Sequence, residues 1–189
     1  MQNFKKEIKP TEVKELFQKE FLPLVKQEYP SIDYILSDIE QLGFFTAPAS
    51  TKYHLPIEGG LALHSLNVLV ISLNLYNQLK EINCSFNFTQ SDLIIAAFLH
   101  DIGKIGFHKN PIYLKESNNE YIYNQNSPLT PRDLGLYYAG KYNFPPHVTE
   151  AIALHDGGFV EQNKIYGFKT GQLTKLVMAA DILAVTFLE

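Results

Sequence analysis

The feature that most limits how this chain can fold is an apolar segment that ends in two ionisable residues. Residues 93–99 read Leu-Ile-Ile-Ala-Ala-Phe-Leu, and His100 and Asp101 follow directly. A helix that is apolar on all sides is normally buried on all sides. Burying an unpaired carboxylate costs several kcal/mol, which is comparable to the net stability of a small domain. The segment therefore predicts a helical core in which a cation compensates the carboxylate.

Three more apolar segments each carry one ionisable group in the same way: His64, His155 and Asp181. Each group alone has an ordinary explanation, because a core histidine can satisfy its ring nitrogens by hydrogen bonds and an aspartate can pair with a lysine. Together, these separate burial penalties would each need a separate solution. Helical bundles build metal sites from side chains on facing helices. We therefore predict that a divalent metal ion is bound by His64, His100, Asp101 and Asp181.

Helix periodicity, caps and breakers predict an all-α chain with one small β-hairpin. Thr130 followed by Pro131 is typical of a helix start, and Thr89 or Ser91 is suited to cap the segment that leads to His100. We expect helices over residues 11–26 with a kink at Pro23, 32–42, 61–80, 90–102, 131–142, 146–156 and 172–189, and hairpin strands over residues 112–115 and 121–124.

The length of 189 residues suits one domain with a small attachment. We expect residues 1–43 to form an N-terminal helical extension packed on the core, and residues 44–189 to form the main domain. Residues 43–60 are rich in proline, glycine, serine and threonine, so they are predicted to be a long loop. Long loops inside a domain are often functional.

Charge and cysteine content narrow the partners and the compartment. The formal net charge is −4, and Arg132 is the single arginine among 16 basic residues. Nucleic-acid binders normally carry a basic field, so the composition does not favour a nucleic-acid partner. The one cysteine, Cys84, excludes an intrachain disulfide and fits a reducing, cytoplasmic compartment. Residues 1–10 lack the apolar stretch of a signal peptide, and no apolar run is long enough to span a bilayer, so no membrane partner is expected.

The ordered set of ionisable residues resembles the HD-domain superfamily of metal-dependent phosphohydrolases. The family pattern is a histidine, then a His-Asp pair, then a distant aspartate, and here it reads His64, His100-Asp101 and Asp181. The surrounding segments are similar to a bacterial and phage subgroup that also resembles the HD domain of certain 3′→5′ exoribonucleases. These segments are residues 47–50, 53–54, 58–68, 151–158 and 179–184. The resemblance extends from residue 47 to the C-terminus and implies an HD-domain helical bundle.

The resemblance assigns four ligands to one metal ion: His64, His100, Asp101 and Asp181. Two imidazoles and two carboxylates suit Mn, Fe, Co, Ni or Zn, and they suit Mg less well because Mg prefers surroundings made of oxygen. Two-metal members of the family carry a further histidine in the helix that corresponds to residues 130–139, where this chain has none. We therefore expect one tightly held ion, with at most a weaker second one.

The resemblance also implies a catalytic and substrate-binding set. Lys104 matches a lysine that contacts substrate phosphate, although a lysine there also complements the C-terminal end of a helix. His155 matches a histidine that binds a second metal or the substrate, and His54 matches a pocket histidine. Glu58 lies in a glycine turn that leaves room for substrate. We expect Asp101, Lys104 and His155 to be catalytic, and the substrate contacts to come from His54, Glu58 and Lys104.

The chemistry implied is hydrolysis of a phosphate ester, in the first place that of a nucleotide, by metal-activated water. Asp101 would orient the water, Lys104 would hold a phosphate oxygen, and His155 or His54 would protonate the leaving group. Two alternatives stay open: a single-strand nuclease similar to 3′→5′ exoribonucleases, and a non-catalytic metal-binding HD module that senses a ligand. The expected partner is a small phosphorylated substrate, and a homodimer is a further expectation.

Overall fold

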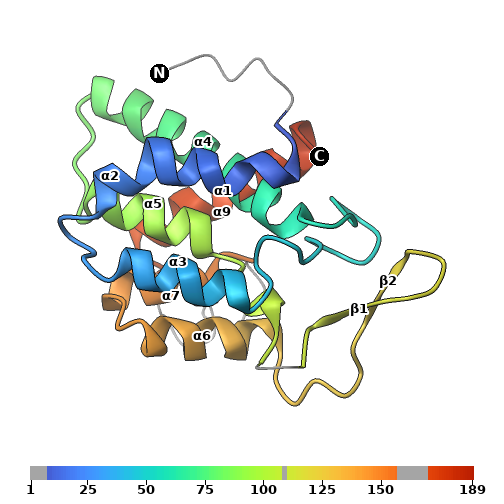
Figure 1. The fold of residues 1–189 in the computed structure, drawn as a ribbon. Helices are drawn as coiled ribbons and strands as arrows, with labels where there is room; N and C mark the ends of the chain where they lie inside the picture. Colours follow the sequence, from blue (N-terminus) through green and yellow to red (C-terminus); the bar gives the residue numbers. More distant parts are fainter. Residues whose placement is uncertain (1–7, 108–109, 157–169) are drawn as a thin grey trace, which may run out of the picture.

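Helices make up most of the chain that the structure describes, which is residues 8–107, 110–156 and 170–189 of a computed structural model (Figure 1). The long helices are α3 Ile32–Gln41, α4 Gly60–Glu81, α5 Gln90–Leu99, α6 Pro131–Lys141, α7 Pro146–Leu154 and α9 Gln172–Phe187. The short elements are α1 Val13–Leu16, α2 Leu22–Val25, β1 Tyr113–Lys115 and β2 Tyr121–Tyr123. The predicted all-α class with one small hairpin is confirmed. Among the helices described, none combines the length and apolarity needed to cross a membrane.

Helix α5 lies at the centre of the core. Every residue from Ser91 to Leu99 is buried, and α4, α7 and α9 all pack against α5, while α9 also packs along α4. The prediction that the apolar segment is buried on all sides is therefore confirmed. Because α5 has no exposed face, the residues at its C-terminal end are delivered into the interior of the bundle.

The α-helical part of α5 ends at Leu99, so the predicted continuation to Ile102 is wrong. His100 is the C-cap residue, Asp101 has φ −100° and ψ 17°, and a short 3-10 helix over residues 102–105 follows. The chain tightens here because the next residues pass directly against the backbone of α6. His100 and Asp101 thus lie between two helical segments, so the directions of their side chains are not fixed by the regular geometry of α5.

Two predicted helix starts are confirmed as capping boxes. Thr89 accepts a hydrogen bond from the backbone N–H of Asp92 while the Asp92 carboxylate accepts one from Thr89, and Thr130 and Asp133 do the same for α6. Thr89, rather than Ser91, therefore caps α5. The Ser91 hydroxyl donates instead to the carbonyl oxygen at the end of α2.

The predicted helix over residues 11–26 is divided near Pro23. A π-helical segment, Phe17–Phe21, separates α1 from α2, and Pro23 lies in the first turn of α2. Proline has no N–H to donate to the carbonyl group four residues earlier, so the regular hydrogen-bond pattern is interrupted here. The predicted kink takes the form of this π segment.

The N-terminal helices share one apolar core with the rest of the bundle. Phe17 stacks on Phe98 of α5 with 3.9 Å between the ring centroids, and Val13, Val25 and Ile32 are buried in the same core. The boundary at residue 43 between an extension and a main domain stays a prediction.

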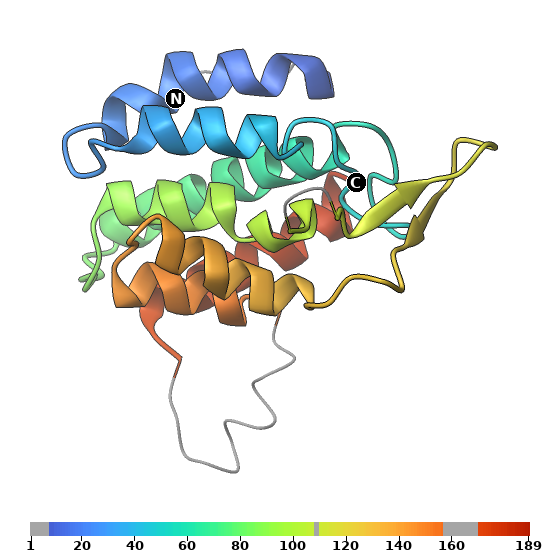
Figure 2. The ribbon, with the colours of Figure 1, turned by 60° about the horizontal axis from the view of Figure 1, so that its bottom comes forward.

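The hairpin of β1 and β2 projects from one end of the bundle. Its antiparallel register pairs Tyr113 with Tyr123 and Lys115 with Tyr121. In both Figure 1 and Figure 2 the hairpin lies at the end of the bundle where α9 terminates and where the loop before α4 runs. Three segments that are distant in sequence therefore meet at this end.

Asp92 joins three parts of the fold through buried polar contacts. The Tyr29 hydroxyl donates to Asp92 across 2.5 Å, and Nε2 of His147 at the start of α7 lies 2.9 Å from the same carboxylate. Burial alone would raise the pKa of Asp92, but the hydrogen bonds from Tyr29 and Thr89 outweigh it and hold the pKa below its ordinary value. The charged form of Asp92 therefore stabilises the fold.

We predict that Gly103→Ala destabilises the protein. A Cβ at Gly103 would lie 1.8 Å from the carbonyl oxygen of Pro131 and 2.7 Å from the backbone nitrogen of Gly135. Forcing α6 away should lower the free energy of unfolding by roughly 1–3 kcal/mol or more, measured by urea denaturation. Gly140→Ala, on α6, is the matched control, because no other atom lies within 4 Å of the position that its Cβ would take. That control should be neutral or stabilising by about 0.5–1 kcal/mol, and equal losses in both variants would contradict the prediction.

We predict that Asp92→Asn lowers stability at neutral pH by roughly 1–3 kcal/mol, since the Tyr29 hydroxyl loses a charged acceptor. The folded-state pKa of Asp92 lies below the unfolded value of 3.8. Its stabilisation is therefore complete above pH 3.8 and is lost as the pH falls through the folded-state pKa. The difference between parent and variant in urea denaturation should narrow at acid pH. Asp33→Asn, at an exposed ion pair with Lys26, is the control with little effect, and a difference that does not change with pH would contradict the argument.

Candidate metal centre

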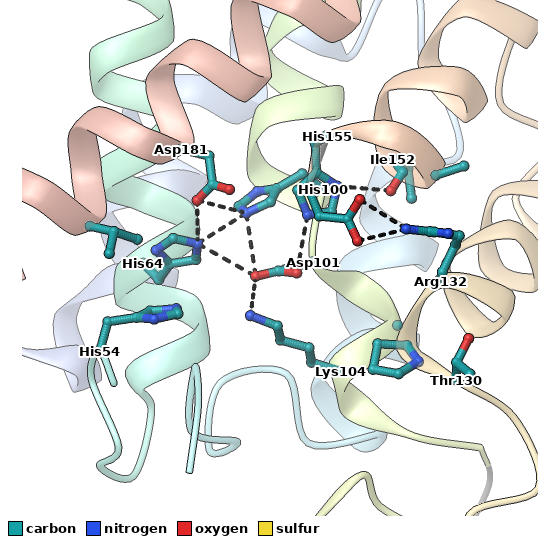
Figure 3. A pocket seen from close by; sticks show the side chains of 15 residues that line it. His54, His64, His100, Asp101, Lys104, Thr130, Arg132, Ile152, His155 and Asp181 are labelled. Atoms are coloured by element: carbon teal, nitrogen blue, oxygen red, sulfur yellow. Dashed lines mark hydrogen bonds and ion pairs between the residues drawn. The ribbon is translucent and has the colours of Figure 1, made fainter. Parts of the chain in front are cut away.

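The structure brings together the four side chains that the sequence predicts as metal ligands (Figure 3). His64 comes from α4, His100 and Asp101 come from the end of α5, and Asp181 comes from α9. The Nε2 atoms of the two histidines lie 3.1 Å apart. Nε2 of His64 lies 3.4 Å from Oδ2 of Asp101 and 3.2 Å from Oδ1 of Asp181. Nε2 of His100 lies 3.4 Å and 4.0 Å from the same two oxygens.

The two histidine rings are oriented by hydrogen bonds at their outer nitrogens. Nδ1 of His100 lies 2.8 Å from the carbonyl oxygen of Ala97, to which it can only donate. Nδ1 of His64 lies 3.0 Å and 3.1 Å from the two carboxylate oxygens of Glu189, which also accept. Each ring therefore holds a proton on Nδ1 and turns Nε2, the nitrogen that can ligate an ion, to the centre of the cluster.

Burial and charge make the cluster attractive to a cation. His64 and His100 are buried, and Asp101 is 8% exposed. Burial lowers the pKa of His100, which keeps its ring neutral. Burial would do the same to His64, but the surrounding carboxylates, Asp101 and Asp181 first, raise its pKa well above the ordinary value. The carboxylates thus favour positive charge at the position they surround.

The donor set fits a divalent metal ion. Bonds from such an ion to imidazole nitrogen and carboxylate oxygen measure about 2.0–2.2 Å, so its ligand atoms lie roughly 3–4 Å from one another. The distances from His64 and His100 to the other donors, 3.1 to 4.0 Å, fall in this range. Lone pairs and carboxylates at such spacing repel one another unless a cation lies between them. His64, His100 and Asp101 are therefore spaced to hold a divalent ion, and Asp181 lies 3.2 Å from Nε2 of His64 as a fourth donor.

Lys104 lies against the same cluster. Its Nζ is 2.6 Å from Oδ2 of Asp101, and its side chain is 16% exposed. Burial alone would lower the pKa of Lys104, but the Asp101 carboxylate raises it above the ordinary value, so the ammonium stays charged. The same ion pair outweighs burial at Asp101 and holds the pKa of that carboxyl well below its usual range. A fixed positive charge therefore stands beside the metal position.

His155, at the end of α7, faces the other oxygen of Asp101. Its Nε2 lies 3.4 Å from Oδ1 of Asp101, and its Nδ1 donates to the carbonyl oxygen of Ile152 across 2.9 Å. Burial alone would lower the pKa of His155, but Asp101 outweighs it and raises the pKa above the ordinary value. Asp101 thus stands between the metal position, Lys104 and His155.

A cavity of about 590 Å³ opens over the cluster. Its walls include all four predicted ligands and also Lys104, His155 and His54 (Figure 3). The ends of α5, α7 and α9 and the start of α6 enclose it. The cavity is large enough for a nucleotide, since small-molecule sites measure roughly 300–1,000 Å³.

His54 is placed in the cavity by the predicted long loop. The Ser50 hydroxyl accepts a hydrogen bond from the His54 N–H and donates one to the His54 carbonyl oxygen, at 3.0 Å and 2.8 Å. The His54 ring centroid lies 4.9 Å from that of His64. Its Nε2 is buried, and no group in the described part of the chain accepts from or donates to it. Burial lowers the pKa of His54, helped by Lys104, so the ring is neutral.

Glu58 is the one predicted site residue that the structure places outside the metal cavity. It is exposed and forms an ion pair with Lys115 of the hairpin across 3.4 Å. Glu58 lines a neighbouring hollow of about 270 Å³. Lys104 lines both the hollow and the metal cavity, so Glu58 lies on the other side of Lys104 from the cluster.

Sequence reasoning missed two contributions to the site. Glu189 reaches the outer nitrogen of His64, and nothing in the local pattern at the end of α9 signals this. Arg132 was noted only as the single arginine, yet it lines the cavity and donates to both oxygens of Asp156 at 2.9 Å and 3.0 Å. In the sequence, Arg132 is marked only by its place in the first turn of α6, after the predicted N-cap Thr130. The structure shows that this turn lies close to the segment that follows His100 and Asp101.

A second group of side chains that could hold an ion shares residues with the first group. His100, His155 and Asp181 form another group spaced for an ion, but it shares two side chains with the cluster above. Helix α6 presents Pro131 and Arg132 to the cavity and contains no histidine. His108, the nearest histidine in sequence, lies outside the described residues. The number of ions bound stays a prediction.

Comparison with known proteins places the chain in a family. The HD domain family model matches residues 61–186, so the chain belongs to the HD-domain family. The matched range contains all four predicted ligands together with Lys104 and His155, and it leaves His54, Glu58 and Glu189 outside.

Two curated proteins are similar over part of their length. The dihydroneopterin 2′,3′-cyclic phosphate phosphodiesterase of Methanocaldococcus jannaschii is 29% identical over 139 residues, which cover 73% of this chain and 51% of that protein. The 3′-5′ exoribonuclease YhaM of Oceanobacillus iheyensis is 35% identical over 100 residues, which cover 51% of this chain and 29% of that protein. The aligned region therefore spans about half of the first relative and less of the second. No solved structure gives a significant match.

We predict that a divalent ion stabilises the protein through this cluster. Adding Mn²⁺ or Zn²⁺ to metal-stripped protein should raise Tm, and an ion at 100 times its Kd adds about 2.7 kcal/mol to the free energy of unfolding. His64→Ala and Asp181→Asn should each abolish most of this shift, because each removes a ligand. Asp33→Asn, at an exposed carboxylate paired with Lys26, should keep it. A Tm that does not respond to metal in the parent protein would refute the site.

Proposed function

We propose that this chain is a metal-dependent phosphohydrolase that cleaves a phosphate ester of a nucleotide. One observation carries the proposal: a charged lysine and the buried group of predicted metal ligands lie side by side on the wall of one cavity. The Nζ of Lys104 is 2.6 Å from Asp101. A cation centre and an ammonium group side by side suit the charge that develops on phosphoryl oxygens. The names of the two relatives, a cyclic-phosphate phosphodiesterase and an exoribonuclease, support cleavage of a phosphodiester or phosphomonoester.

The metal ion would be held by His64, His100, Asp101 and Asp181. When bound, a divalent ion supplies a Lewis acid for phosphoryl oxygen and makes water a stronger nucleophile at neutral pH. The mixed nitrogen and oxygen donors favour Mn, Fe, Co, Ni or Zn over Mg.

Asp101 and Lys104 have different roles in the proposed reaction: Asp101 orients the attacking water, and Lys104 binds the phosphate. Oδ2 of Asp101 faces the cluster and Lys104, while Oδ1 faces the cavity side, 3.4 Å from His155. That second oxygen is free to accept a hydrogen bond from the attacking water and orient it. Lys104 donates to a non-bridging phosphate oxygen and stabilises the charge that builds there.

His155 is our candidate for the acid that protonates the leaving oxygen. Its Nδ1 is fixed on the carbonyl oxygen of Ile152, so Nε2 is the atom that can exchange a proton in the cavity. His54 is held by the Ser50 turn with a buried, unsatisfied Nε2. It suits a hydrogen bond to the substrate, which agrees with its expected role in binding.

Glu58 is proposed to contact the part of the substrate beyond the phosphate. A phosphate placed at Lys104 leaves the rest of a nucleotide room in the hollow of about 270 Å³ on the far side of that lysine. Glu58 and Lys115 can accept from and donate to ribose or base, and Tyr113 offers a ring for stacking. A homodimer and a cytoplasmic location stay predictions.

A single-strand nuclease is the second candidate, favoured by the similarity to YhaM. RNA carries a charge at every nucleotide, and its binders depend on a basic surface. Here the net charge is −4, and the single arginine, Arg132, is engaged by Asp156. A small nucleotide therefore fits the charge distribution better than a polynucleotide does.

The test is hydrolysis of a panel of nucleoside monophosphates, cyclic nucleotides and a short RNA, each with Mn²⁺, Co²⁺ or Ni²⁺. We predict metal-dependent release of phosphate or nucleoside from small nucleotides. Cleavage restricted to RNA, with binding that weakens steeply as salt rises, would select the nuclease instead. Metal-loaded protein that cleaves nothing would leave the sensor module as the function.

We predict that Lys104→Met lowers kcat on the best substrate by roughly 10²–10³-fold, because a fixed charge at the phosphate is lost. The variant should keep its bound metal, measured by elemental analysis, since Lys104 is not a ligand. Lys115→Met is the matched control, because the exposed Lys115 contacts Glu58 and the ring of Tyr121 and lies outside the metal cavity. It should alter KM more than kcat. A Lys104→Met variant with parental kcat would exclude the proposed role.

A further inference from the structure

Glu189 makes a contact to the metal cluster that neither the family match nor the sequence assigns. Its carboxylate oxygens lie 3.0 Å and 3.1 Å from Nδ1 of His64. The Asn67 side-chain amide donates to the same carboxylate across 3.0 Å. Asn67 lies three residues after His64 on α4 and so shares its helix face. The carboxylate of Glu189 thus accepts hydrogen bonds from two side chains that lie one turn apart on α4.

The three histidines next to Asp101, which are His64, His100 and His155, are fixed in two different ways. His100 and His155 donate from Nδ1 to backbone carbonyl oxygens of their own helices, at 2.8 Å and 2.9 Å. His64 instead donates to the charged side chain of Glu189, which lies just beyond the end of α9. A carboxylate accepts more strongly than a carbonyl group and increases the electron density at the opposite ring nitrogen. His64 is therefore expected to be the most basic nitrogen ligand of the cluster.

Charge balance supports the same role. Three carboxylates surround His64, from Asp101, Asp181 and Glu189. Together they match the charge of one divalent ion and the Lys104 ammonium. A charge buried without such balance is costly, so Glu189 lowers the cost of placing a divalent ion beside a buried lysine.

We propose that Glu189 is a positioning residue: it accepts the Nδ1 proton of His64, fixes the ring in the tautomer that presents Nε2, and thereby tightens metal binding. The proposal rests on the metal centre of the proposed function. Glu189 lies at the opposite edge of the imidazole ring from the cluster, so it acts through His64 and does not reach the same ion.

The experiment uses the full chain with Zn²⁺, which is diamagnetic. Glu189→Gln, Glu189→Ala and the parent are compared for Kd by competition with a chelator and for the number of ions bound. Long-range ¹H–¹⁵N spectra of the metal-free proteins report which nitrogen of His64 carries the proton, because an ion on Nε2 would by itself leave the proton on Nδ1. Glu81→Gln, at an exposed position in the last turn of the same helix α4, is the matched control.

We expect Glu189→Ala to weaken Zn²⁺ binding by roughly 10–100-fold, as loss of such outer contacts does, with one ion still bound. In the metal-free variant the Nδ1–H signal of His64 should be lost. Glu189→Gln keeps an acceptor oxygen, so it should retain the tautomer and lose less affinity. Glu81→Gln should match the parent. If Glu189→Ala does not fold, the glutamine variant still decides, since parental affinity there would remove the role of the carboxylate charge.

Two results would overturn the proposal. Parental Kd and an unchanged His64 tautomer in both Glu189 variants would mean that the contact is structural only. A lower number of bound ions in Glu189→Gln would make Glu189 a direct ligand, for example with His54, whose donor atom lies within 4.8 Å of those of His64 and Glu189. Neither result depends on catalysis. A parent that binds Zn²⁺ but cleaves no nucleotide would refute the proposed function and leave this inference intact.

Discussion

The rest of the structure depends on how the negative charges of Asp101 and Asp181 are compensated inside an apolar bundle. Both carboxylates lie where α4, α5 and α9 meet, and the imidazoles of His64 and His100 are turned toward them. A carboxylate there is tolerable only with compensating positive charge. Lys104 supplies part of it, and a divalent ion is suited to supply the rest. The contacts at the outer edges of the histidines, to Ala97 and Glu189, keep the rings available for that ion.

The fold supplies this centre through a buried helix that stops abruptly. Helix α5 is enclosed on all sides, so its C-terminal end is deep in the bundle. The close approach of Gly103 to α6 then turns the chain, and this turn lets His100, Asp101 and Lys104 point toward one region. The same turn brings the start of α6 to the cavity. Stability and site geometry therefore depend on one backbone contact.

The cavity and the neighbouring hollow give the site an asymmetry that suits a nucleotide. The metal cluster lies on one side of Lys104, and the hollow beside the hairpin lies on the other. A phosphate group at the lysine thus leaves the organic part of a substrate a separate place. The hairpin and the loop before α4 lie at the same end of the bundle (Figure 2). In the proposed function they would contact that part of the substrate, and they belong to no ligand-bearing helix.

The sequence by itself determined the helical class, the capped helix start at Thr130, two candidates for the cap of α5, and the group of four candidate ligands. Helix periodicity and the cost of burying charge act locally, within one segment at a time, so they identify the helices and the unusual buried groups. The resemblance to the HD family then selects the four ligands among those groups. The sequence misplaced the end of α5 because the turn there depends on contact with α6, about thirty residues later. Only the tertiary structure decided that Glu58 stands apart from the cluster and that Glu189 reaches His64. Those outcomes depend on how helices pack, since a side chain's partners across a bundle are set by distance in space and leave no periodic signal in the sequence.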